Sequence, residues 1–102
     1  MGVDLLELVR VLEELQAFLR QFEEQHWSEM IENDLFFLRK GDLYGARRFL
    51  GYFGGMGSFN DLWLCEANGH AVPDDVQQRV NAELDRLKSR AWALANEAAS
   101  NV

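Results

Sequence analysis

The sequence of 102 residues has little cysteine, little proline and few basic side chains. Its one cysteine, Cys65, excludes an intramolecular disulfide and any metal site with two or more cysteine ligands. A reducing cytoplasmic setting is therefore expected. No run of about 18 apolar residues occurs, and residues 1–10 are not a basic region followed by an apolar stretch, so we expect neither a membrane span nor a secretory signal.

Acidic residues outnumber basic ones by 17 to 10, and the formal net charge is −7. This charge repels a phosphate backbone and argues against a general nucleic-acid binder. Residues 1–34 hold nine acids and two arginines, whereas residues 35–56 hold one acid and the basic side chains of Arg39, Lys40, Arg47 and Arg48. Two interpretations stay open: the acids lie beside these basic side chains within the fold, or they form a face that docks a basic partner.

Apolar residues repeat at helical spacing along most of the chain. A first stripe steps by three and four through positions 5, 8, 12, 15, 19 and 22, widened by Leu6, Val9 and Phe18, and Asp4 with Glu7 can form a capping box at its start. A second stripe has a new phase and predicts a break near residues 25–28, with Ser28 as N-cap; it comprises Trp27, Met30, Ile31, Leu35 and Leu38. One long helix with a stutter is the alternative.

The remaining sequence predicts further helices. Gly41 ends the second helix, and Asp42 can cap a third whose stripe is Leu43, Ala46, Leu50 and Phe53. Ser58 with Asp61 predicts a short helix over residues 59–66, with a strand as the weaker alternative, and Pro73 begins a last helix whose apolar positions run from Val76 to Ala98. We therefore expect one all-α domain over residues 1–102, a bundle of four or five helices with a central Gly-rich turn.

Residues with possible chemistry do not form a recognisable catalytic set. The segment Gly55-Met56-Gly57-Ser58 has neither phosphate-loop nor dinucleotide spacing, which favours a glycine corner between closely packed helices. The spacing of Cys65, His70 and His26 specifies neither a nucleophile with its base nor a metal site, so we expect no enzyme activity, metal or cofactor.

The acids of residues 23–34 are instead suited to docking a basic protein, because a cluster of like charges steers an oppositely charged partner. The predicted contact residues are Glu23, Glu24, Glu29, Glu32 and Asp34, with Trp27 as an aromatic anchor.

One motif resembles a known family. The stretch Gly-Gly-Met-Gly-Ser-Phe-Asn-Asp at residues 54–61, together with residues 41–48 and Asn68-Gly69-His70, resembles a family of small uncharacterised bacterial domains. In size and charge such domains are similar to immunity proteins of bacterial polymorphic-toxin and contact-dependent inhibition systems. The resemblance implies a non-enzymatic protein that neutralises a cognate toxin domain with a basic surface.

Two other functions stay open. One is a small enzyme or ligand-binding domain with a site around the turn at residues 54–61, built from Arg47, Arg48, Ser58, Asn60, Asp61 and His70. The other is a structural homo-oligomer assembled through the first or last helix. Because each apolar stripe is wide enough to be buried in the core of a single chain, we expect a monomer or weak dimer.

Overall fold

The computed structural model of the chain describes residues 5–54 and 58–100. Within these residues the chain forms four α-helices and three single-turn 3₁₀ helices, so the all-α prediction is confirmed. They are α1 (Leu5–Gln21), α2 (Gln25–Arg39), α3 (Tyr44–Leu50), η1 (Phe59–Asp61), η2 (Glu66–Asn68), η3 (Asp74–Val76) and α4 (Gln77–Ser100). None of the described helices is both long and apolar enough to cross a membrane. The predicted capping residue Asp4 and the glycines at positions 55 and 57 lie outside the described residues.

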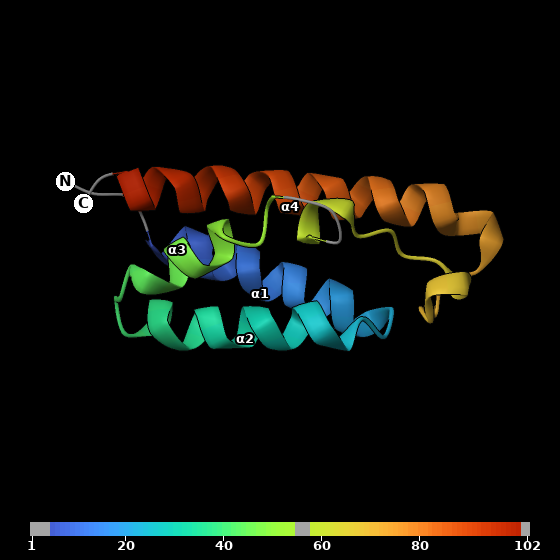
Figure 1. The fold of residues 1–102 in the computed structure, drawn as a ribbon, viewed down its shortest axis with the longest axis horizontal. Helices are drawn as coiled ribbons and strands as arrows, with labels where there is room; N and C mark the ends of the chain where they lie inside the picture. The colour runs from blue at the N-terminus through green and yellow to red at the C-terminus, as the bar shows by residue number, and fades with distance from the viewer. Residues whose placement is uncertain (1–4, 55–57, 101–102) are drawn as a thin grey trace.

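The four helices pack side by side, and α1 and α3 each contact both α2 and α4 (Figure 1). The long α4 runs along one side of the bundle and α2 along the opposite side. The segment between α3 and α4 returns along α4 and carries the 3₁₀ turns (Figure 1). This return segment brings residues between 58 and 70 next to the beginning of α2.

The predicted apolar stripes form the core. The fully buried apolar side chains of α1 and α2 come from the two stripes, and α4 adds Val80, Leu84, Leu87 and Ala91. Phe49 and Phe59 are the largest fully buried side chains, and their rings lie 6.1 Å apart. Leu6, expected to widen the first stripe, is 58% exposed. The spacing of three and four therefore predicted the buried faces, because it places side chains on one side of a helix.

The break between the first two helices lies earlier than predicted. Helix α1 ends at Gln21, and Glu23 has a φ of 63°, a left-handed conformation that stops the helix. Glu24 is the N-cap of α2, and its Oε2 accepts a hydrogen bond from the Trp27 N–H at 2.8 Å. Ser28, the predicted cap, is buried one turn inside α2, where its hydroxyl donates to the Gln25 carbonyl. The sequence-based assignment was wrong because the left-handed Glu23 ends α1 before position 25 and the Glu24 carboxylate takes the capping role.

Residues 59–66 differ from the predicted short helix. A single 3₁₀ turn, η1, is capped by the Ser58 hydroxyl, which accepts a hydrogen bond from the Asn60 N–H at 3.3 Å. The chain is extended at Leu62 and at Cys65 before η2 begins. The cap was predicted correctly, but the helix does not continue, because the backbone of Leu64 bonds to α4 instead.

That attachment is made by Asn81, a buried side chain of α4. Its Oδ1 accepts from the Leu64 N–H and its Nδ2 donates to the Leu64 carbonyl, both at 2.8 Å. One amide side chain thus satisfies both backbone groups of a buried residue, as a neighbouring strand would.

Replacing Asn81 by Ala should lower the free energy of unfolding by about 2 kcal/mol, since it leaves buried backbone groups of Leu64 without partners. Urea denaturation checks this. Asn96→Ala, at an exposed position of the same helix, is the matched control and should change stability by less than about 0.5 kcal/mol. Equal effects of the two substitutions would contradict the role assigned to Asn81.

Candidate functional site

A shallow groove of about 270 Å³ lies where the N-terminus of α2 meets the return segment. We call it the α2 groove; it is lined by Glu24, Trp27, Ser58, Asp61, Leu62, Trp63, Asn68 and His70. Two predicted contact residues, Glu24 and Trp27, therefore lie beside three members of the alternative site, Ser58, Asp61 and His70. The sequence placed these residues in separate sites, and tertiary packing brings them into one.

Glu24 and His70 form the polar floor of the groove. Glu24 Oε1 lies 3.1 Å from His70 Nε2, while its Oε2 caps α2, and both side chains are nearly buried. His70 Nδ1 accepts a hydrogen bond from the Cys65 backbone N–H at 3.1 Å. Because Nδ1 is an acceptor, the neutral ring carries its proton on Nε2 and donates it to Glu24. Both ring nitrogens are therefore engaged, and the partner at position 65 is the backbone rather than the thiol.

Two tryptophans flank this floor. Trp27 is half-buried, and its ring lies 4.9 Å from that of Phe59 and 5.3 Å from that of Tyr52. Trp63 is 45% exposed, and its Nε1 donates to the Gln77 side chain at 3.2 Å. The Trp27 ring therefore packs against aromatic side chains of the core, whereas part of the Trp63 indole is exposed and can contact a partner.

Glu23 and Glu29 lie at the corner between α1 and α2, next to the groove. Both are exposed, and together with Arg20, Gln25 and Ser28 they line a second surface depression. These two acids are predicted contact residues, and Glu32, whose side chain is 47% exposed, is a third that solvent reaches.

Comparison with known proteins identifies the family. Residues 20–73, more than half of the chain, match the model of a family described as a domain of unknown function, DUF6966. The chain belongs to this family. No curated protein and no solved structure matches it.

The DUF6966 segment contains every residue that lines the α2 groove. It begins one residue before the end of α1 and ends just before η3, so it comprises α2, α3 and the return segment. The uncharacterised domain family expected from the turn motif is thus supported, and the groove lies wholly within the part of the chain that the family defines.

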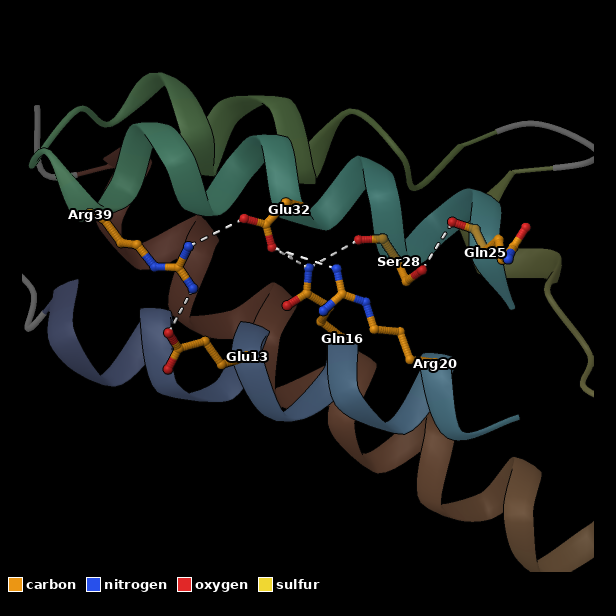
Figure 2. Close-up of polar contacts among 7 residues, drawn as sticks. All are labelled: Glu13, Gln16, Arg20, Gln25, Ser28, Glu32 and Arg39. Carbon is orange, nitrogen blue, oxygen red and sulfur yellow. Dashed lines mark hydrogen bonds and ion pairs between the residues drawn. The ribbon is translucent and has the colours of Figure 1, made fainter. Parts of the chain in front are cut away.

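Glu32, another predicted contact acid, is bonded to side chains of both α1 and α2 (Figure 2). Its Oε1 accepts from Gln16 Nε2 at 2.7 Å, and its carboxylate lies 3.4 Å from Arg39 and 3.7 Å from Arg20. The Gln16 hydrogen bond, followed by the positive charges of Arg39 and Arg20, holds the pKa of Glu32 below its ordinary value. Arg39 also pairs with Glu13 at 2.8 Å, so the acidic first third of the chain is partly neutralised by the basic middle.

Asp34 cannot act as a contact residue, because it is fully buried. Its Oδ1 accepts hydrogen bonds from Arg48 Nε at 3.0 Å and from the Tyr52 hydroxyl at 2.9 Å. Its Oδ2 has no hydrogen-bond partner among the described residues. Removal from water raises the pKa of Asp34 to about 6. The prediction was wrong for Asp34 because the sequence does not show which helix face carries Arg48 and Tyr52.

The six residues of the alternative site do not meet at one place. Ser58, Asp61 and His70 line the α2 groove, whereas Asn60 lines a cleft beside α4 and Arg47 and Arg48 line a third depression. Arg48 serves as the partner of Asp34. The structure therefore distributes the six residues over three depressions and brings only Ser58, Asp61 and His70 together.

Some groove residues were missed by the sequence analysis. Leu62, Trp63 and Asn68 were not among the predicted site residues, and their position depends on the bonds that hold the return segment. The Ala71 N–H donates to the Phe22 carbonyl at 3.0 Å, which fixes this segment against the end of α1. Across the described residues no group of three or more His, Cys, Asp or Glu side chains is arranged to hold a metal ion.

Proposed function

We propose that this chain is a non-enzymatic binding protein, most concretely an immunity protein that neutralises a cognate bacterial toxin domain by direct binding. The observation that carries the proposal is the α2 groove, which is lined by an exposed indole, Trp63, and by the carboxyl group of Asp61, with the Glu24–His70 pair at its floor. An arginine or lysine side chain of a partner is complementary to such a groove, because its charge interacts favourably with carboxylates and with an aromatic face.

The surroundings of the groove add to this complementarity. Glu23 and Glu29 are exposed at the adjacent corner, and the whole chain has a net charge of −7. Acids around an interface attract a basic partner before contact and orient it. Trp63 is the expected anchor, because exposed tryptophans are enriched among the residues that dominate binding energy.

Co-expression with the product of the neighbouring reading frame tests the proposal. We expect that product to be toxic alone and the chain to restore growth and form a purified one-to-one complex with it. The Trp63→Ala variant should lose at least about tenfold in affinity, as hot-spot tryptophans do. Trp92→Ala, which removes a comparably exposed tryptophan from α4, is the matched control and should retain affinity. A non-toxic neighbour that forms no complex would overturn the proposal.

Association with the toxin should be steered by charge. The double variant Glu23→Lys with Glu29→Lys should slow association about 10- to 100-fold with a smaller change in dissociation. Raising salt from about 0.05 M to about 0.5 M shortens the Debye length from about 14 Å to about 4 Å and should have a similar effect. Stopped-flow or surface-based kinetics measure both rates. Glu24 and Glu32 are unsuitable for charge reversal, because one caps α2 and the other bonds to Gln16.

The matched control for this experiment is Glu14→Lys with Glu97→Lys, which changes the net charge equally at exposed positions of α1 and α4. Its association rate should stay within about threefold of the wild-type rate, because these positions lie away from the groove. Association that is indifferent to salt and to the reversals at positions 23 and 29 would contradict steering by this corner.

A second candidate function, binding of a small ligand near the turn, is favoured by the presence of Ser58, Asp61 and His70 in one groove. The Asp61→Ala variant distinguishes the two functions. If it stays folded, binds the toxin normally and loses a small ligand, the groove is a ligand site. Sedimentation at several concentrations tests the remaining candidate, a structural homo-oligomer, and we expect a monomer or weak dimer.

A further inference from the structure

Aromatic and basic side chains gather where the second half of α2 packs beside α3 (Figure 1). The rings of Phe36 and Phe37 lie 5.5 Å apart, and those of Phe37 and Tyr44 lie 4.9 Å apart. Lys40 Nζ lies 4.3 Å from the centre of the Phe36 ring, and the Arg48 guanidinium lies 5.9 Å from that of Tyr44. We call this surface the α3 face; it comprises Phe36, Phe37, Lys40, Tyr44, Arg47 and Arg48.

A depression of about 390 Å³ lies within the α3 face. Tyr44, Arg47, Arg48 and Gly51 line it from α3 and its C-terminal end, because positions three, four and seven apart share one side of a helix. The depression is at the opposite end of α2 from the α2 groove, and the two share no lining residue. The α3 face is therefore a separate surface with a hollow of its own.

The composition of the α3 face is that of a protein interface. Phe36 is 57% exposed and Tyr44 is 47% exposed, although both are large aromatic side chains. Aromatic residues and arginine are enriched at the centre of protein interfaces, where a few of them supply most of the binding energy. These side chains in contact with one another favour a docking surface for another protein.

The charge of the α3 face specifies the kind of partner. Within the described part of the chain neither Lys40 nor Arg47 forms an ion pair, whereas Arg48 pairs with the buried Asp34. Asp42 is the only acid of the sequence between positions 35 and 58, and its Oδ1 accepts from the Tyr44 N–H at 2.9 Å. Exposed cations without a carboxylate partner thus outnumber exposed acids here, in a chain whose net charge is −7.

We infer that the α3 face docks an acidic segment of a partner protein, whose carboxylates pair with Lys40 and Arg47. An apolar side chain of the same segment packs on Phe36 and Tyr44 and buries their exposed rings. The planar guanidinium of Arg47 matches a carboxylate through two parallel hydrogen bonds. This partner is opposite in charge to the basic toxin expected at the α2 groove, so the inference goes beyond the proposed function.

A protein segment fits this surface better than a nucleic acid does. A long phosphate backbone extends past the α3 face and is repelled by the acids of the rest of the chain. A short acidic segment stays near the α3 face, and charges more than about 8 Å away are largely screened at physiological salt.

The test is a titration of the isotope-labelled chain with a short peptide that alternates glutamate and leucine, followed by NMR near pH 7. We expect saturable shifts at the backbone amides of Tyr44 and Arg47, with the indole N–H of Trp63 in the α2 groove as the internal control. A peptide that alternates glutamate and serine has the same charge without the apolar side chains and should bind at least about fivefold more weakly. Raising salt from about 0.05 M to about 0.5 M should weaken binding as well.

Variants at exposed positions separate the two contributions. Arg47→Gln and Phe36→Ala should each weaken binding of the glutamate–leucine peptide at least about fivefold. Their matched controls on α4 are Arg79→Gln, an exposed arginine, and Trp92→Ala, an exposed aromatic residue, and both should leave binding unchanged. Arg48 is unsuitable for substitution, because it also bonds to Asp34.

Four results would overturn the inference. They are no saturable shift at the α3 face, binding to Arg47→Gln as tight as to the wild type, tighter binding of oligothymidine or of anionic lipid vesicles than of the peptide, and dimerisation of the chain that Phe36→Ala abolishes. Each of these leaves the proposed interaction with a toxin unaffected, because the α2 groove contains none of these residues.

Discussion

The stability of this protein should fall by about 3 kcal/mol, relative to that of an Asp34→Asn variant, as the pH rises from below 3.8 to above 6. The folded protein holds the Asp34 proton up to a pKa of about 6, whereas the unfolded chain releases it near 3.8. Between these values the unfolded state gains an ionised carboxylate that the folded state does not, so unfolding becomes easier. Above pH 6 Asp34 is ionised in the folded state as well. The difference in free energy of unfolding between the wild type and the variant then stays constant.

The physical cause is burial of the carboxyl group. Asp34 is fully buried, and although Arg48 and Tyr52 bond to its Oδ1, its Oδ2 has no partner among the described residues. The cost of removing the charge from water therefore exceeds the gain from the two hydrogen bonds. Asparagine keeps an oxygen that accepts from both neighbours and carries no charge at any pH.

Urea denaturation of both proteins between about pH 4 and about pH 7 measures the difference. Other titrating groups contribute equally to the free energy of unfolding of both proteins, so the difference between the two proteins reports Asp34. Glu32 is one of these groups, and its lowered pKa has the opposite effect on stability. Asp75→Asn, at an exposed aspartate, is the matched control and should follow the wild-type curve. Parallel curves for the wild type and Asp34→Asn would show that Asp34 is already ionised in the folded state.

Substituting Gly45 by Ala should destabilise the bundle by about 3 kcal/mol. A Cβ atom at position 45 would overlap the Asp34 carbonyl oxygen and would lie 2.8 Å from Leu38 Cγ. The first of these contacts is with backbone, so α2 and α3 must move apart. The better helix propensity of alanine returns only about 1 kcal/mol.

Gly54→Ala is the matched control, because a Cβ atom there meets nothing within 4 Å. Its effect on the free energy of unfolding, measured by urea denaturation, should stay within about 1 kcal/mol of zero. Equal effects at positions 45 and 54 would contradict the close approach of α2 and α3 at Gly45. The predicted role of glycine in close helix packing thus applies to Gly45, which the sequence analysis did not single out.

Local sequence determined the helices. The spacing of apolar residues predicted the buried faces of α1, α2 and α4, since side chains three and four positions apart share one side of a helix. The sequence also predicted where helices end. Gly41 and Gly69 both follow helix ends, and both have the positive φ values that favour glycine. These features depend on residues close together in the chain, and a periodic pattern contains that information.

Tertiary structure alone decided which charges are available to a partner. Glu24, Glu32 and Asp34 look equivalent to Glu23 and Glu29 in the sequence, yet the first three are bonded to His70, Gln16 and Arg48. Their partners come from other elements, up to 46 residues away in the case of His70. The α2 groove arises in the same way, because it is formed where the return segment meets α2. Helical periodicity describes one helix at a time, so it cannot show which polar side chains of different helices meet once the apolar faces have packed.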